Sequence, residues 1–312
     1  MSRSAFFVVA PIVVILGLAT AFSQRWDVDT PRIGLAVANL QADFFNQIKQ
    51  SVTAEAAKRG IDVVVADARG DAATQVNQIE DFVTKQVDGI IYIPAGATAA
   101  GVPVKAARKA HIPIVAVDRN PPDAPADTFI ASDSVASAKK LGEYVAKQTG
   151  GEGQVAILQG QIGTTPEIDR NQGFQEALDE SPGLRVVAEQ PADWDQDKGF
   201  NVAQNMLQAH PDVSVFFGRA DAMALGAAQA VRVANVKHKV TIVGFDGDVA
   251  GLKAVDAGVI DATMTQQTQR MGRMAVQSTE QLIAGDKVPK QQLLPAFLTT
   301  KANAAEYIAK HP

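Results

Sequence analysis

Ile112-Pro113-Ile114-Val115-Ala116-Val117-Asp118-Arg119 is an apolar run that ends abruptly on a carboxylate and a guanidinium. An apolar run bounded by proline and charge is typical of a buried parallel strand. Residues just past the carboxyl end of such a strand face the crevice in which open α/β sheets bind ligands. The stretch therefore predicts that Asp118 and Arg119 form the floor of a binding site. For this strand end taken alone, a loop-capping Asp118 and a surface Arg119 are the alternative.

Short apolar runs alternate with helix-period segments around this strand. In the chain up to residue 131, the alternation predicts strands at residues 32–38, 61–67, 89–93, 112–117 and 128–131. The helices expected between them cover residues 43–59, 71–86 and 98–110. Strands that alternate with helices in this way form a doubly wound parallel sheet.

A second set of the same kind begins with a helix at residues 134–148, which Ser134 is expected to cap. Its expected strands lie at residues 154–158, 185–189, 213–217, 240–245 and 260–265, with helices at 167–179, 198–209, 220–234 and 249–257. There follow a helix at 269–284, one strand at 292–299, and a helix at 302–310 that Asn303 is expected to cap. The predicted fold class is α/β, with two doubly wound parallel-sheet lobes and a ligand cleft between them.

The length, net charge and cysteine content of the chain exclude several classes of function. The 312 residues are enough for two domains of common size. The net charge is 29 − 34 = −5 with no basic tract, which argues against nucleic acid or an anionic membrane surface as the main partner. The chain has no cysteine, so disulfides, thiolate nucleophiles and zinc–cysteine sites are excluded.

The first 23 residues have the features of a signal peptide. Arg3 precedes an uncharged run at residues 5–22, and Ala19, Ala21 and Ser23 are small residues of the kind found at a signal-peptidase site. We expect export to the periplasm, with a mature chain that begins near Gln24. The run is also about as long as a thin membrane span, so an uncleaved anchor is the alternative.

Catalytic signatures are absent from the sequence. The four histidines do not stand at metal-ligand spacing from one another or from a carboxylate cluster, so neither a metal nor a cofactor is expected. The sequence has no Gly-x-Ser-x-Gly elbow and no Gly-x-x-x-x-Gly-Lys loop. We therefore do not expect an enzyme.

Polar planar groups and aromatic rings recur at the ends of the predicted strands. The candidate binding residues are Phe44, Phe45, Asp118, Arg119, Arg170, Trp194, Asp246 and Gln266. Carboxylates and guanidiniums can each make two hydrogen bonds to sugar hydroxyls, while an aromatic plane covers the C–H face of the ring. Taken singly, each residue also has an ordinary structural explanation, such as a core phenylalanine or a turn aspartate.

These strand ends carry motifs that resemble the ribose-binding-protein branch of the periplasmic sugar-binding proteins of ABC importers. The motifs are Ala42-Asp43-Phe44-Phe45, Val117-Asp118-Arg119, Gln190-Pro191-Ala192-Asp193-Trp194 and Val243-Gly244-Phe245-Asp246-Gly247, and the resemblance runs from about Pro31 to Thr299. It implies a monomeric type I periplasmic binding protein in which the eight residues line the sugar pocket, with Trp194 at a position that is usually phenylalanine. It also implies an N-terminal lobe of residues 31–132 plus 267–295, a C-terminal lobe of 133–266 plus 296–312, and a three-segment hinge. The expected partners are a small sugar or polyol and an ABC permease.

The sequence departs from the ribose binders at four positions near the expected pocket. Ala42, Ile93 and Ala220 stand where that family carries asparagine, so three amides that could bind hydroxyls are missing. Because a buried hydroxyl without a partner costs about 1–3 kcal/mol, ribose itself is not the expected ligand. Asp43 stands where the family usually has proline, and either adds an acceptor or caps the first helix.

Two other classes of protein share this two-lobed core. Repressors of the lac type carry a basic helix-turn-helix ahead of it, and here those positions hold an apolar leader, so that hypothesis fails. A membrane-anchored sugar sensor or chemoreceptor adaptor is the alternative that stays open, and it differs from a periplasmic carrier only in the fate of residues 1–23.

Overall fold

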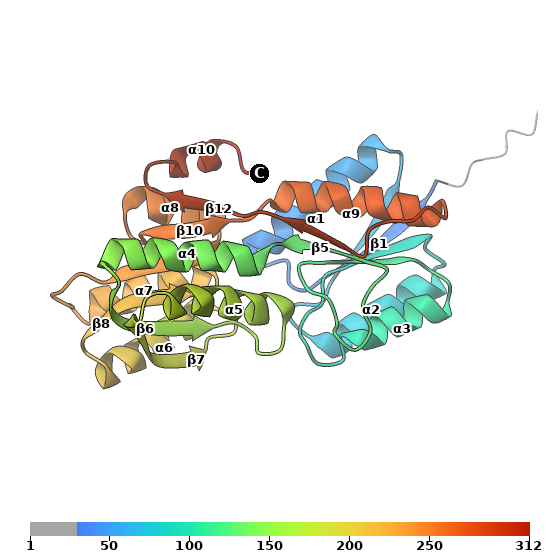
Figure 1. Ribbon diagram of the computed structural model, residues 1–312. Coiled ribbons are helices and arrows are strands. Elements are labelled where there is room, and N and C mark those ends of the chain that lie inside the picture. The colour runs from blue at the N-terminus through green and yellow to red at the C-terminus, as the bar shows by residue number, and fades with distance from the viewer. Residues whose placement is uncertain (1–29) are drawn as a thin grey trace, which may run out of the picture. The chain divides into compact units, whose positions relative to one another are not determined.

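The computed structural model describes residues 30–312, which form two six-stranded sheets with helices on both faces (Figure 1). The predicted signal peptide lies outside the described residues. Within residues 30–312, no helix is both long enough and apolar enough to cross a membrane.

The first sheet is parallel throughout, in the order β11-β5-β4-β3-β1-β2. Its strands are β1 (Arg32–Val37), β2 (Asp62–Asp67), β3 (Gly89–Tyr92), β4 (Ile114–Val117), β5 (Thr128–Ser132) and β11 (Gln291–Leu294). Its helices are α1 (Asp43–Lys58), α2 (Ala72–Thr84), α3 (Gly101–Lys109) and α9 (Thr268–Ile283).

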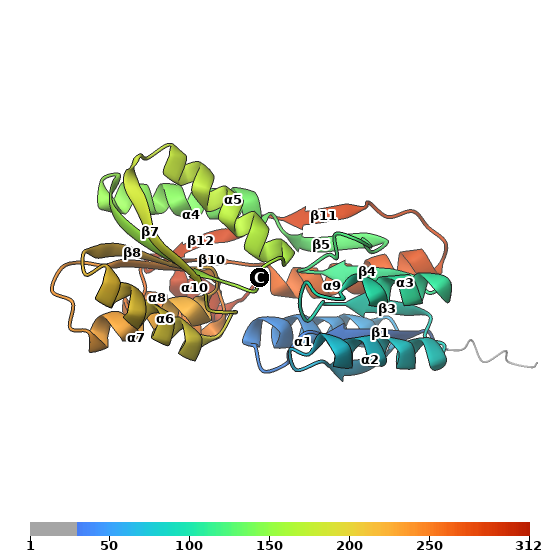
Figure 2. The same ribbon diagram turned by 90° about the horizontal axis from the view of Figure 1, so that it is seen from below.

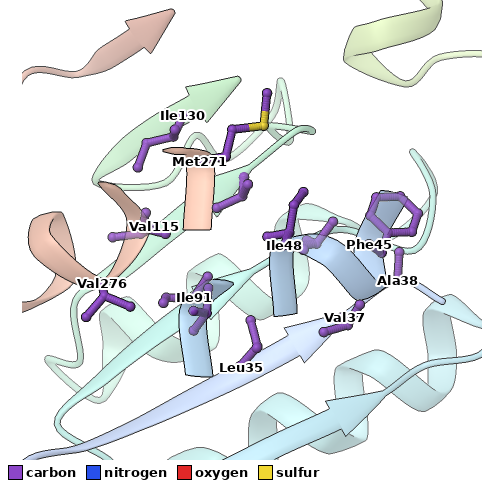
Figure 3. Close-up of a cluster of buried hydrophobic side chains, with 14 of the residues drawn as sticks. Leu35, Val37, Ala38, Phe45, Ile48, Ile91, Val115, Ile130, Met271 and Val276 are labelled. Carbon is purple, nitrogen blue, oxygen red and sulfur yellow. The ribbon is translucent and has the colours of Figure 1, made fainter. Parts of the chain in front are cut away.

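Alternate residues of each strand point to opposite faces, which gives the first sheet two cores. Leu35 and Val37 of β1 pack with Ile48 of α1 and Met271 of α9 on one face, as Figure 3 shows. Ala36, between them, belongs to the opposite cluster with side chains of α2 and α3. Burial on both faces explains why the strands are continuously apolar in sequence.

The second sheet has the order β12-β10-β9-β8-β6-β7 and is parallel except for the antiparallel pair β10–β12. Its strands are β6 (Glu152–Gln159), β7 (Gly183–Pro191), β8 (Val213–Gly218), β9 (Thr241–Asp246), β10 (Ala262–Thr265) and β12 (Phe297–Thr300). Its helices are α4 (Ser134–Thr149), α5 (Thr165–Asp179), α6 (Gln196–Ala209), α7 (Asp221–Val233), α8 (Val249–Ala257) and α10 (Ala304–Ala309). In Figure 2, α4 and α5 lie on one side of this sheet and α6, α7 and α8 on the other.

The chain passes between the two sheets three times, after β5, after β10 and after β11. The single strand predicted at residues 292–299 is therefore wrong. It is two strands, of which β11 pairs with β5 in the first sheet and β12 pairs with β10 in the second. Pro295 separates them and has no N–H for a sheet ladder, so the pairing ends where the chain changes sheets. The two-lobed α/β fold class with a three-segment hinge is confirmed.

The predicted cap at Ser134 is wrong, and Asn303 occupies the predicted N-cap position of α10 but makes no side-chain cap hydrogen bond. Ser134 is the first residue of α4, and the cap is Asp133, whose Oδ1 accepts from Ala136 N (3.1 Å). Asn303 precedes α10, but its Oδ1 accepts from Thr300 N (2.8 Å) and its Nδ2 donates to Leu298 O (3.1 Å). Its side chain thus closes the turn that leaves β12.

Candidate functional site

A cavity of about 440 Å³ opens where strand ends of the two sheets meet. Its wall includes seven of the eight predicted binding residues: Phe44, Phe45, Asp118, Arg119, Arg170, Trp194 and Asp246. The eighth, Gln266, is buried and reaches this wall through Asp246 Oδ1, to which its Nε2 donates (2.7 Å). The remaining lining residues are Ala38, Asn39, Gln41, Ala42, Asp43, Gly70, Ala95, Gln161, Pro166, Asp193, Asp195, Gln196, Ala220, Ala222 and Asp248.

The first-sheet half of the site is built at the end of β4. Asp118 and Arg119 follow the strand directly, are each 6% exposed, and form an ion pair with 3.4 Å between Oδ2 and Nε. Arg119 Nη1 donates to the carbonyl oxygens of Pro94 (3.0 Å) and Ala95 (3.2 Å), which follow β3. It also donates to Gln161 Oε1 (3.1 Å), which follows β6 of the second sheet. The guanidinium is therefore held between neighbouring strand ends.

Phe44 and Phe45 lie in the first turn of α1 and serve two purposes. Their rings meet edge to face, with centroids 5.3 Å apart, and both rings belong to the core between α1 and the first sheet (Figure 3). Both also line the cavity, and the Arg119 guanidinium lies 5.3 Å from the centre of the Phe45 ring. The two rings are therefore both part of the core and part of the cavity wall.

The second-sheet half of the site joins residues that are far apart in sequence. Asp246 ends β9, and its Oδ1 lies 3.2 Å from Nη2 of Arg170, in the second turn of α5. Arg170 is 3% exposed, donates from Nη1 to the carbonyl of Arg219, and stacks 3.9 Å from the centre of the Phe245 ring. The guanidinium is thus fixed on three sides.

Trp194 lies in the loop after β7, between the two arginines. Its ring centre is 5.9 Å from the Arg119 guanidinium and 5.5 Å from that of Arg170. A Cβ added to Gly160 would lie only 1.9 Å from the indole ring, so the ring rests directly on the Gly160 backbone. The glycine leaves the space that the indole occupies.

A buried ionic cluster supports this half of the site. Glu167 of α5 accepts from Gly160 N through Oε2 (2.7 Å) and from Arg219 Nη1 through Oε1. Arg219 Nη2 also donates to Asn171 Oδ1 and Glu189 Oε1, both at 2.5 Å. The cluster holds Gly160 under Trp194 and the carbonyl that binds Arg170.

Three of the predicted residues adopt left-handed or neighbouring backbone conformations. The φ angles are +63° at Asp118, +67° at Trp194 and +127° at Asp246. Positive φ in a residue other than glycine costs on the order of 1–3 kcal/mol and persists where the surrounding structure enforces it, which is common at binding sites. Three such residues lie at this one cavity, which makes it the candidate functional site.

Burial shifts the pKa of Asp118 and Asp246, the two carboxylates paired with arginines at the cavity. Desolvation raises the pKa of Asp246 to about 7, helped by the charges of Asp248 and Asp118 and opposed by Arg170 and Gln266. Desolvation likewise raises the pKa of Asp118, against the attraction of Arg119 and Arg170. Both groups are therefore poorly solvated acceptors that a ligand with hydroxyl donors would stabilise.

Several buried polar atoms at the site have no hydrogen-bond partner within residues 30–312. They include Nε of Arg119, Nε of Arg170, Nε1 of Trp194 and Oε1 of Gln266. Leaving a buried polar group unpaired costs about 1–3 kcal/mol, so such atoms are uncommon away from functional sites.

The four additional candidates lie in different places. Asp43 lines the cavity, and its Oδ2 accepts from Gln47 Nε2 (2.8 Å) and Val249 N (3.1 Å). Ala42 and Ala220 also line it, at N-caps that make no side-chain bond. Ile93 is fully buried in the core of the first sheet, in the same cluster as Phe44 and Phe45, and does not itself line the cavity.

Sequence reasoning missed Gln161 and Asp248, which line the cavity, and the Glu167–Arg219 pair beneath it. Gln161 comes two residues after β6 and Asp248 two residues after β9, so the strand-end rule could have found both. The pair gives no sequence signal, because Glu167 and Arg219 lie on separate elements. No cluster of three or more histidine or acidic side chains placed to hold a metal occurs in the described part of the chain.

Comparison with known proteins finds close relatives along most of the chain. A family model described as a periplasmic binding protein domain matches residues 33–287. The chain is 38% identical over 283 residues to the ribose import binding protein of Escherichia coli K12, covering 91% of this chain and 94% of that protein. It is 30% identical over 278 residues to the xylitol-binding protein of Mycolicibacterium smegmatis, covering 88% and 78%. An ABC transporter solute binding protein from Bacillus halodurans, solved with bound myo-inositol, superposes with a TM-score of 0.85 at 30% identity, covering 90% and 98%.

Proposed function

The chain belongs to the periplasmic binding protein family, as a ribose-binding-like, non-enzymatic sugar-binding component of an ABC importer, and we propose that it delivers a small neutral sugar or polyol to an import permease. The main support for this proposal is that two buried ion pairs, Asp118–Arg119 and Asp246–Arg170, line the same cavity beside Trp194. The pairs come from different sheets, so one ligand between them would touch both.

The chemistry of the wall suits hydroxyl groups. Carboxylates accept and guanidiniums donate, and a hydroxyl does both, so each ion pair can hold two neighbouring hydroxyls. Nε of Arg170 has no partner within residues 30–312 and supplies a further donor. The rings of Phe45 and Trp194 offer apolar faces for the C–H side of the ligand.

Charge and volume narrow the ligand class. Six aspartates and two arginines line the cavity, so a sugar phosphate or a sugar acid would meet net repulsion. About 440 Å³ lies within the range of pockets that hold small molecules. Ala42 and Ala220 offer no amide, so the ligand should present no hydroxyl there. The relatives bind ribose and xylitol and a structural neighbour holds myo-inositol, so the preferred candidates are pentoses, hexoses, pentitols and cyclitols.

Binding should be coupled to movement of the two sheets about the three crossings. We take residues 31–132 plus 267–295 as one lobe and 133–266 plus 296–312 as the other. A ligand that contacts both lobes has more affinity for the closed arrangement than either half-site can provide, so it shifts the population toward closure. The permease would recognise the closed form. The expected location of the mature protein is the periplasm, as for the relatives.

A thermal-shift panel tests the proposal. The probes are D-ribose, D-allose, L-arabinose, xylitol and myo-inositol, with D-ribose 5-phosphate and D-gluconate as charged controls. A ligand at a thousand times its dissociation constant stabilises the folded state by about 4 kcal/mol, which is a shift of several degrees. We expect at least one neutral compound to do so and neither anion. A shift with an anion alone would contradict the assignment.

A further inference from the structure

The C-terminal segment, residues 301–312, follows β12 and lies beyond the matched family domain. It is anchored to the second sheet, because Ala304 of α10 is buried in that sheet's core and Tyr307 stacks on Phe297 with ring centroids 5.8 Å apart. From α10 the chain turns back, and its end lies beside the first turn of α9 in both views (Figures 1 and 2). There Arg270 N donates to Pro312 O (3.2 Å). The segment therefore runs from the second sheet to a helix of the first.

His311 forms the link at this junction. Its Nε2 lies 2.7 Å from Gly247 O in the loop after β9, and its Nδ1 lies 3.2 Å from Thr268 Oγ1 at the start of α9. A carbonyl oxygen only accepts, so Nε2 carries the proton and donates. Desolvation lowers the pKa of His311, against the effects of the Gly247 carbonyl and of the Asp43 and Asp248 charges, so the imidazole is neutral at neutral pH. The one hydroxyl proton of Thr268 is donated to Gln47 Oε1, so Nδ1 of the neutral imidazole contacts the Thr268 oxygen without sharing a proton with it.

The His311 contacts continue into a closed ring of polar contacts. Thr268 Oγ1 donates to Gln47 Oε1 (2.7 Å), and Gln47 Nε2 donates to Asp43 Oδ2 (2.8 Å). The same Asp43 oxygen accepts from Val249 N (3.1 Å), two residues after Gly247. Two contacts of this ring, Thr268–His311 and the hydrogen bond from Val249 N to Asp43, join elements of the first sheet to elements of the second.

We infer that His311 is a positioning residue and that residues 301–312 act as a clasp, holding the lobes toward the closed arrangement and fixing the loop that follows the ligand carboxylate Asp246. The ring borders the cavity, since Asp43 and Asp248 line it. Rotation of the lobes away from each other would break Asp43–Val249 and strain the His311 contacts. The inference rests on the proposed closure of the lobes but not on which sugar binds.

The clasp can be tested on the ligand-free, full-length protein. The chain has no cysteine, so Glu80→Cys in α2 and Asn205→Cys in α6, both exposed, can carry spin labels, one on each lobe. Pulsed electron paramagnetic resonance then measures the distance distribution between them. His311→Ala should lower the ratio of the short-distance to the long-distance population about 2- to 10-fold, the effect of losing one neutral hydrogen bond.

Matched variants separate the clasp from a general loss of structure. His238 Nε2 also bonds a backbone carbonyl, that of Val213 (2.8 Å), but within the second lobe, so His238→Ala should leave the distribution unchanged. His311→Gln keeps a donor for Gly247 O and should restore most of the short-distance population. Thr268→Val breaks the ring from its first-lobe side and should act like His311→Ala. Equal distributions in His311→Ala and His238→Ala would overturn the clasp, whereas failure of every sugar in the thermal panel would overturn only the proposed ligand.

Discussion

The two halves of the cavity present the same chemistry but are assembled differently. In the first-sheet half, the carboxylate and the guanidinium are neighbours in sequence, and backbone carbonyls that follow β3 hold Arg119. In the second-sheet half, Asp246 and Arg170 are 246 − 170 = 76 residues apart, and Gln266 and the Arg219 carbonyl hold them. In the first half both charged side chains come from one strand end, whereas in the second half the packing of separate elements brings them together. Mutations should therefore have local effects in the first half and more widespread effects in the second.

The largest expected effect comes from removing either guanidinium. Arg119→Ala and Arg170→Ala should each weaken binding of the best sugar in the panel by more than tenfold, because charged hydrogen bonds contribute about 1.5–3 kcal/mol each. Arg170→Ala should also lower the stability of the second lobe, because it leaves Asp246 buried without its ion pair. Isothermal calorimetry and urea unfolding measure the two effects.

Arg185 on the exposed face of β7 provides a matched control. Arg185→Ala removes a guanidinium of the same size and should change neither affinity nor stability appreciably. Wild-type affinity in both cavity variants would reject the proposed site.

The second prediction concerns pH. Asp246 has a pKa of about 7 in the folded protein against 3.8 in the unfolded chain, so between these values the folded protein binds more protons at this position. The free energy of unfolding contributed by Asp246 is therefore highest below pH 4 and falls as the pH rises through 7. Asp246→Asn removes this dependence, so the free energy of unfolding of the variant minus that of the wild type should rise, by on the order of a few kcal/mol, as the pH rises from 4 to 8, whatever constant amount the loss of the Arg170 ion pair subtracts.

Urea unfolding of both proteins at several pH values checks the sign. Asp118→Asn should change the pH dependence in the same direction, because burial raises the pKa of Asp118 as well. A wild-type protein that gains stability over Asp246→Asn as the pH rises would show that Asp246 is ionised more easily in the folded state than its burial implies.

The third prediction concerns a substitution that displaces the Trp194 ring while the tryptophan itself is kept. Gly160→Ala places a methyl group where the indole ring lies, so the ring must move, and sugar affinity should fall several-fold. In a Trp26→Phe background, Trp194 is the single tryptophan and its emission should shift. Gly96→Ala is the control, since its added Cβ would come no closer than 4.0 Å to Gln161. Unchanged emission in Gly160→Ala would show that the indole does not rest on this glycine in solution.

The smallest expected effect is a gain in stability. Ala220 is the N-cap of α7 in an extended conformation that suits asparagine, and its side chain makes no cap bond. Ala220→Asn should stabilise the protein by about 1 kcal/mol through capping. If the new amide also reaches a hydroxyl, D-ribose affinity should rise up to about tenfold. A gain in stability with no gain in ribose affinity would place the amide out of the sugar's reach.

The difference between the two halves also explains what sequence reasoning could predict. Asp118 and Arg119 were recognisable because one strand carries both, and the alternation of strands and helices predicted the two-sheet fold. The ion pair between Asp246 and Arg170 was not recognisable, because neither segment of the sequence indicates that it contacts the other. The split of the predicted strand at residues 292–299 was missed for the same reason, because the choice of a sheet edge depends on partners, β5 and β10, that lie far away in sequence.

The positive φ angles of Asp118, Trp194 and Asp246 have a consequence for how ligand preference can change during evolution. A substitution at these positions must satisfy an unusual backbone as well as a ligand, so few residue types are tolerable there. Ala42 and Ala220 have extended backbones that most side chains can adopt. If the proposed ligand contacts hold, a lineage could exchange one small polyhydroxylated nutrient for another by altering these two alanines, while the strained residues stay the same.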